Sequence, residues 1–464
     1  MDSRQETVSG VAGRGARKCC GGTLARKQSK RLAFEFSLRS CFGTLFLSAC
    51  CLARPSAAFT LAEAEKELLA NNTDIALATA SVESAAASVT VAGQSPNPTF
   101  SMQSTQYSPI TGLGSGRPTD KALDTIVGLS LLLERGNKAK LRRDAATGQL
   151  DGTRHDLREA RRQQRLALHQ AYYDLKLAGE RLVLARETRE LASQALAAAD
   201  RRVAAGDLAA VDRYRLAVDA LRTTNDVTGA ESELQQARLA LAQLLGRQRD
   251  DGTAGTAGRN AAAIGTLEAT DPWPVATRRA NEAGDAQKMR ADVAAAEARL
   301  AAAQTNRELA RSLRSRDVTV GAQVERVPGS TAGITFGVNL SFPLFVNYRY
   351  DGEIARAEAD YSAALLMRQK VLTQATTEIA KARAALDGTQ QRLASFESDI
   401  LPAAKKALDA IEFAYARGAA PLTDALDARR TWRTTQLDLA SARADHAKAL
   451  AAWHATTEWE LVLP

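Results

Sequence analysis

The 464-residue chain is 45% hydrophobic but only 5% aromatic, and Ala, Leu, Arg, Glu, Asp and Gln fill long stretches, a composition typical of extended helices and coiled coils. Its formal net charge is +8, yet residues 1–58 alone hold ten basic and three acidic residues. Because the nearly neutral remainder lacks the concentrated basic surface of a nucleic-acid-binding protein, we expect no nucleic-acid partner.

Residues 1–58 are predicted to be an export leader, because basic residues up to Arg39 are followed by an apolar run and then by small residues. All five cysteines lie before residue 52, as expected for an exported chain without structural disulfides. Two cleavage sites are open. Residues 56–58 (Ser-Ala-Ala) fit ordinary signal peptidase, whereas residues 47–50 resemble a lipobox, which would shorten the leader to 1–49 and leave a lipid on Cys50.

The first half of the remaining chain, residues 59–247, predicts the following order of elements: a helix, a strand over 99–107, a loop over 108–122, a strand around 127–131, a very long helix over 137–205, a tight turn and a returning helix. In the long helix, Ala alternates with Leu or Val at heptad spacing. At 1.5 Å per residue it would be roughly 100 Å long, so it must pack beside other long helices.

The second half, residues 272–464, repeats this order at an offset of about 210 residues. Gly206 and Asp212 of the first turn recur as Gly418 and Asp424 of the second. A repeat of this length indicates a duplicated domain. Residues 248–271, rich in Gly and Thr and without periodicity, are predicted to link the two copies.

The predicted strands alternate apolar and polar residues, most clearly over 334–342 and 318–325. Strands of about 9 to 11 residues with one apolar and one polar face are typical of a membrane barrel. No run of about 18 apolar residues occurs, so we predict that no helix spans a membrane. Four strands cannot close a barrel by themselves, and open edges are not tolerated in hydrocarbon. Several chains must therefore share one barrel.

These features together resemble the TolC-type outer-membrane efflux family over the whole region from Phe59 to about Trp459. The residues that carry the resemblance are the two Gly/Asp helical turns, the opening residues 69–72 (Leu-Ala-Asn-Asn) and the strand end 341–345 (Ser-Phe-Pro-Leu-Phe). The resemblance implies a mainly α fold with a small β part. Each chain would give four strands to a trimeric twelve-stranded barrel and two helical hairpins to a long α-helical barrel.

The resemblance also implies the location and the partners. A homotrimer would lie in the lipid of the bacterial outer membrane, extend into the periplasm, and work with a periplasmic adaptor and an inner-membrane RND transporter. Residues 132–138 (Leu-Leu-Glu-Arg-Gly-Asn-Lys) look like a turn of the heavy-metal branch, which exports cobalt, zinc, cadmium or nickel ions. Export of drugs or organic solutes by the same kind of channel is the alternative, and a periplasmic adaptor (membrane fusion) protein is the less favoured one.

The two turns are the candidate functional sites. Glycine suits the left-handed backbone that ends a helix, and an aspartate in the next first turn favours that helix dipole. We therefore expect Gly206, Asp212, Gly418 and Asp424 at hairpin tips that form the periplasmic mouth and contact the adaptor. Arg417 and Asp424 are the candidate gate, pairing across helices to hold the tunnel closed.

No catalytic, metal or cofactor site is predicted. The four histidines lack the spacing of metal ligands, and the motifs of nucleotide-binding loops, zinc proteases and serine hydrolases are absent from the sequence. Carboxylates such as Asp151 and Asp174 lie among arginines and are predicted to form solvated ion pairs. The chain is therefore not expected to be an enzyme.

Overall fold

The computed structural model describes residues 59–105, 124–247, 264–265, 267–274, 290–326 and 333–457, all of which belong to one unit, Ser56–Pro464. The predicted leader and Cys50 lie outside the described residues. Within them the chain is mainly helical with one four-stranded sheet, as predicted.

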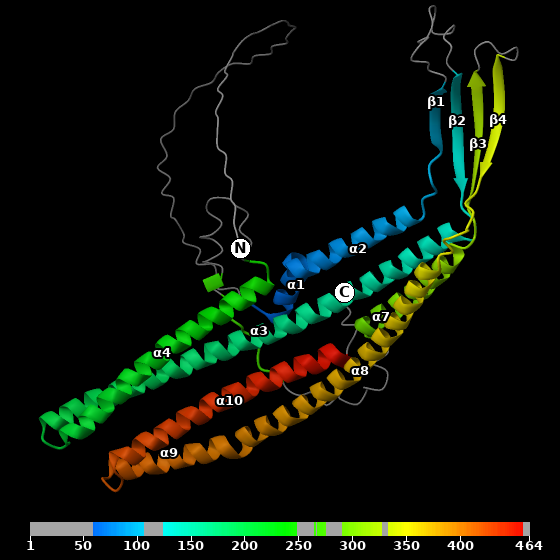
Figure 1. Cartoon of the computed structure of the whole chain (residues 1–464). Coiled ribbons are helices and arrows are strands. Elements are labelled where there is room, and N and C mark those ends of the chain that lie inside the picture. The colour runs from blue at the N-terminus through cyan, green and yellow to red at the C-terminus, as the bar shows by residue number, and fades with distance from the viewer. Residues whose placement is uncertain are drawn as a thin grey trace, which may run out of the picture. The chain divides into compact units, whose positions relative to one another are not determined.

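The sheet is antiparallel in the order β1 (Thr99–Thr105), β2 (Asp124–Leu133), β3 (Val318–Arg326) and β4 (Ile334–Ser341), with the strands side by side in Figure 1. The pairing of β2 with β3 joins the two sequence repeats, in a register that sets Leu133 opposite Val318. Strands β1 and β4 are the two edges. The two repeats thus share one sheet.

The helices are α1 (Leu61–Asn71), α2 (Thr73–Ala92), α3 (Lys138–Ala204), α4 (Ala210–Leu244), α7 (Ala291–Ser312), α8 (Asp351–Ser395), α9 (Leu401–Ala416) and α10 (Leu422–Thr457). Helix α3 has 67 residues, so the prediction of one long helix over 137–205 is confirmed. It packs along α2, α4 and α7, while α8 packs along α7 and α10 (Figure 1). The long helices therefore do pack side by side.

Both repeats enter their long helix through the same backbone conformation. Asn137, before α3, has φ 59°, and Tyr350, before α8, has φ 62°. Positive φ is tolerated by Asn but is unusual for a bulky residue such as Tyr. The Tyr350 ring lies edge-on to Phe345 at 5.4 Å and to Tyr348 at 5.1 Å. These ring contacts stabilise the second turn.

The main core lies where α1, α3 and α4 meet the segment 264–269, around the fully buried Tyr172. Ile264 and Leu267, within the region predicted as a linker, are 7% and 2% exposed and belong to this core. The Tyr172 hydroxyl donates to the carbonyl oxygen of Phe59 (3.0 Å) and accepts from the backbone N–H of Asp271 (3.2 Å). Burial raises the pKa of Tyr172 to about 12, so the phenol stays neutral.

A short π-helix, Phe396–Ile400, joins α8 to α9. Pro402 is at the start of α9, and a proline ring lacks an N–H and clashes with the carbonyl four residues earlier. The wider π-turn removes this conflict without ending the helical rod. The second hairpin therefore contains one irregular turn that the first lacks.

One helix bears on the prediction that no helix spans a membrane. Helix α2 is long and apolar enough, by length and composition, to cross a membrane. It contains no long unbroken apolar run, because Asp74, Glu83 and several Ser and Thr residues interrupt its Ala, Val, Leu and Ile residues. Here α2 packs along α3.

Candidate functional site: the two-faced sheet and the hairpin tips

One face of the sheet is apolar across all four strands. Register partners share a face, and the rows Phe100–Leu129–Ala322–Val338 and Met102–Val127–Val324–Phe336 each cross the whole sheet. Phe336 and Val338 are 83% and 84% exposed. A continuous exposed apolar surface of this kind marks contact with a membrane or a partner.

The opposite face is polar and closely packed. The row Ser101–Gly128–Gln323–Gly337 crosses the sheet on this side, and the next row places Gly321 beside Asn339. A Cβ on Gly321 would overlap the Asn339 side-chain oxygen, and one on Gly337 would lie 3.0 Å from Gln323 Cγ. The glycines therefore let two amide side chains lie flat on the sheet. This arrangement suits a wall with water on that side.

The strand–helix turns below the sheet are held by ion pairs. The Lys138 ammonium is buried and donates to Asp317 Oδ1 (2.8 Å) and to the carbonyl oxygen of Ser315 (2.7 Å). Asp317 also accepts from the backbone N–H of Arg135 (2.9 Å). Burial, the largest single influence, opposes ionisation of Asp317, but the bonds from Lys138 and the Arg135 N–H and the nearby charges of Lys138 and Arg142 together outweigh it, so the pKa of this carboxyl is lowered. The pair ties the start of α3 to the start of β3.

The two hairpin turns have the predicted backbone. Gly206 has φ 83° and Gly418 has φ 74°. In the first turn, Asp207 N–H bonds the Arg202 carbonyl at 2.8 Å, and in the second, Ala419 N–H bonds the Ala414 carbonyl at 2.9 Å. This six-to-one bond after a left-handed glycine is the Schellman motif, which satisfies carbonyls at a helix end. Asp212 and Asp424 lie in the first turns of α4 and α10.

The structure brings the two turns together. Leu208 of the first turn packs in one cluster with Leu422 and Tyr415 of the second hairpin. Farther along, Arg433 of α10 pairs with Asp226 of α4 at 3.1 Å. Arg417 lies over the Phe413 ring at 3.9 Å, and among the described residues of this single chain it makes no ion pair with Asp424.

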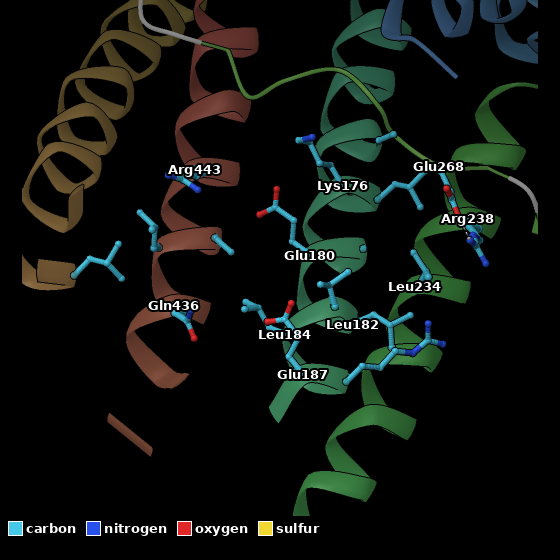
Figure 2. Close-up of a pocket in the computed structure, with 18 of the residues that line it drawn as sticks. Lys176, Glu180, Leu182, Leu184, Glu187, Leu234, Arg238, Glu268, Gln436 and Arg443 are labelled. Carbon is cyan, nitrogen blue, oxygen red and sulfur yellow. Dashed lines mark ion pairs between the residues drawn. The ribbon is translucent and has the colours of Figure 1, made fainter. Parts of the chain in front are cut away.

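A cleft of about 740 Å³ lies between the hairpins, lined by α3, α4, α10 and the segment 268–269 (Figure 2). Arg238 and Glu268 pair across one side at 3.6 Å, while Lys176 and Glu180 project from α3. The described residues contain no group of three His, Cys, Asp or Glu side chains that could hold a metal ion. The cleft separates the hairpins and presents no recognisable catalytic arrangement.

The carboxylates named from the sequence do form ion pairs. Asp151 pairs with Arg154 at 3.0 Å, and Asp174 pairs with Lys448 of α10. His446 is 2% exposed, and burial lowers its pKa, which favours the neutral ring.

Comparison with known proteins decides the family. The sequence profile described as "Outer membrane efflux protein" matches residues 65–247 and 283–455, most of the chain and both repeats. The chain belongs to the outer membrane efflux protein family. It is an outer-membrane channel of a tripartite efflux system that extends into the periplasm, and it is not an enzyme.

Solved structures share the fold of this efflux channel. A membrane protein from Pseudomonas aeruginosa is 22% identical, with a TM-score of 0.73 over 86% of this chain and 90% of that one. VceC from Vibrio cholerae is 20% identical, with a TM-score of 0.71 over 86% of this chain and 96% of its own. CusC, described for its transmembrane channel formation, is 19% identical, with a TM-score of 0.69 over 86% and 91%. No curated protein sequence matches the chain.

Membership of the family places the channel in the outer membrane with an extension into the periplasm. Sequence reasoning located the strands and the turns but missed the Lys138–Asp317 pair and the Tyr172–Asp271 contact. Their only sequence signal was a lysine and two aspartates beside turns, which does not identify a partner.

Proposed function

We propose that three copies of this chain form the exit channel, with a twelve-stranded barrel in the outer membrane and a helical tunnel in the periplasm. The observation that carries the proposal is a four-stranded sheet with one continuous apolar face and two open edges. Unpaired edge groups are costly in hydrocarbon, so β4 of one copy must pair with β1 of the next. Channels of this family form trimers in tripartite efflux systems.

The assembly is tested by cysteine cross-linking across the proposed β4–β1 seam. All five native cysteines precede residue 52, so a cysteine pair placed in the strands is free of others in the mature channel if cleavage occurs after residue 58. A cysteine at Met102 of β1 is combined in turn with one at Phe336, Val338 or Leu340 of β4, because closure of a barrel staggers the register across the seam. Oxidation of the pair that meets across the seam should give a covalent trimer, while a control pair at Phe336 and Leu129, whose strands are not neighbours, should not. A species no larger than a dimer would reject the trimer.

We infer that the solutes are divalent heavy-metal cations such as nickel, cobalt, cadmium or zinc. Residues 132–138, which lead from β2 into α3, support this inference. A deletion strain should lose tolerance to at least one of these metal salts and regain it with the intact gene. Unchanged tolerance to all four metals, with increased sensitivity to organic toxicants, would assign the channel to organic solutes instead.

At the hairpin tips, Gly206, Asp212, Gly418 and Asp424 are proposed to meet the periplasmic adaptor, which links the channel to an inner-membrane RND transporter. The Arg417–Asp424 pair is proposed to close the tunnel between neighbouring copies. Support comes from the packing of the two turns into one tip and from the position of Asp424 in the first turn of α10. Asp424→Ala should raise the conductance of the closed level in single-channel recordings, with Asp427→Ala as a matched control. An unchanged closed level would reject this gate.

The leader is proposed to end either after residue 58 or before Cys50. Mass spectrometry of the mature N-terminus distinguishes the two, because only the second adds lipid to a cysteine. A mature chain that begins at Phe59 would reject acylation of Cys50.

A further inference from the structure

We propose that Arg135, Arg316 and Arg349 form a binding site for the phosphate of anionic phospholipids at the periplasmic rim of the barrel. They lie in the strand–helix junction, defined here as residues 134–142, 314–317 and 342–353. This junction holds seven basic and four acidic residues. The inference rests on the proposed barrel, because the lipid must surround the sheet.

The four carboxylates of the junction are already engaged within the chain. Their partners are as follows: Glu134 with Arg142 (2.5 Å), Asp317 with Lys138 (2.8 Å), Asp351 with Arg314 (2.6 Å) and Glu353 with the Tyr348 hydroxyl. None of these contacts uses the guanidinium of Arg135, Arg316 or Arg349. The internal acids therefore leave four exposed cations, Lys140 and the three arginines, and only the arginines carry the planar guanidinium that binds a phosphate with two bonds.

These three side chains are exposed and form no ion pair with any described residue. Arg135 is fixed through its backbone N–H, which donates to Asp317 and leaves its guanidinium outside the pair. Arg316 lies over the Phe345 ring at 5.5 Å. A stacked guanidinium keeps its N–H donors in plane and available, in the fork that binds phosphate with two bonds.

The position along the sheet selects the ligand. Leu133 and Val318 are the last register pair of β2 and β3 at this end. Arg135 and Arg316 each lie two residues beyond that pair, in the turns that follow β2 and precede β3. The cations thus begin where the apolar face ends.

Aromatic rings mark the same level. Phe345, Tyr348 and Tyr350 form edge-on ring contacts beside the arginines. Tyrosines are enriched at the depth of lipid head groups, where the ring is buried and the hydroxyl is wet. Because the helices lie in the periplasm, this level faces the phospholipid leaflet on the periplasmic side.

The size of the effect follows from membrane electrostatics. Each basic residue near an anionic surface contributes about five-fold to lipid affinity. Three arginines per chain should together favour phosphatidylglycerol by on the order of 100-fold over the triple variant.

The test uses the purified full channel in neutral detergent, with binding of fluorescent phosphatidylglycerol and phosphatidylcholine measured by titration. The variant is Arg135→Gln/Arg316→Gln/Arg349→Gln. The matched control, Arg158→Gln/Arg189→Gln/Arg222→Gln, removes the same charge from exposed arginines of α3 and α4. A third variant changes the junction arginines to lysines, which keep the charge.

We expect the junction variant to lose phosphatidylglycerol binding, the control to keep it within about two-fold, and the lysine variant to lie between them. Equal losses in the junction and control variants would overturn the proposal. So would the absence of any preference of the parent channel for phosphatidylglycerol over phosphatidylcholine. If the triple variant does not assemble, Arg349→Gln alone should still show about a five-fold loss. Parent protein that is not trimeric would count against the barrel, whereas trimers without lipid preference reject only the lipid site.

Discussion

The buried ion pair at the base of the sheet gives the sharpest test of how the strands are joined to the helices. The Lys138 side chain is 7% exposed and that of Asp317 is 26% exposed. Asp317→Asn keeps the shape but leaves the ammonium without its counter-charge. Breaking a buried pair costs about 3–5 kcal/mol. Because Asp317 is partly solvated, we expect the lower value of about 2–3 kcal/mol for local opening of the junction.

Amide hydrogen exchange of the full channel measures this free energy locally. The Arg135 N–H, bonded to Asp317 at 2.9 Å, is the reporter. Its exchange should accelerate roughly 30- to 150-fold in Asp317→Asn. The Lys138→Met/Asp317→Asn double variant should recover most of the exchange protection at the N-terminal end of α3, because no buried charge remains there. An exposed pair, Asp151–Arg154, serves as the control, because Asp151→Asn should change protection by less than about 1 kcal/mol.

The same pair makes the stability of the junction depend on pH. Because the pKa of Asp317 is lowered in the folded chain, its contribution is complete above the unfolded pKa of about 3.9 and is lost as the pH falls through the folded pKa. Protection of Arg135 should therefore decline only in acid, and in Asp317→Asn this decline should be absent. A double-variant coupling below about 0.5 kcal/mol, or an unchanged acid decline in Asp317→Asn, would refute the reasoning.

Three further predictions concern the core, an acid-sensitive contact and the tips. Tyr172→Phe leaves the Asp271 N–H without its acceptor and should destabilise the channel by about 1–3 kcal/mol in thermal unfolding, whereas exposed Tyr214→Phe should have little effect. The Glu65 carboxylate accepts a hydrogen bond from His169 (2.6 Å), and this bond is the main reason that the pKa of Glu65 is lowered. The stability that Glu65 contributes should therefore be lost only as the pH falls below about 4.3, and Glu65→Gln should abolish this loss. A side chain at position 206 would meet no neighbouring atom, but the backbone there has a positive φ that valine rarely adopts. Gly206→Val should therefore destabilise the tip by about 1–2 kcal/mol and increase its proteolysis, and Gly206→Asn should destabilise it less. Equal effects of the two variants would contradict a backbone cause.

Periodicity predicted the elements because each pattern is local. The heptads placed the long helix at 137–205, within one residue at each end of α3, and alternation located both strands of the second repeat. The Gly206 and Gly418 turns were found for the same reason, since a left-handed helix end is set by one residue.

Contacts between distant segments could not be predicted in this way. Residues 248–271 have the composition of a linker, yet Leu267 and Asp271 within them are anchored on α1 and α3 because Tyr172 offers a buried hydroxyl there. The sequence also shows more basic than acidic residues at the junction without showing which are paired. Only the fold reveals that Arg142 and Lys138 neutralise Glu134 and Asp317, which leaves Arg135 available.

The two repeats solve one backbone problem with different chemistry. Each long helix begins after a residue of positive φ, Asn137 in the first repeat and Tyr350 in the second. After Asn137 comes the buried Lys138, which locks β3 to α3, so the first junction is stabilised inside the protein. Tyr350 instead packs against the half-exposed ring of Phe345 and the exposed ring of Tyr348, at the surface of the protein. The two repeats therefore share the turn conformation but stabilise it differently, the first with a buried ion pair and the second with contacts between aromatic rings.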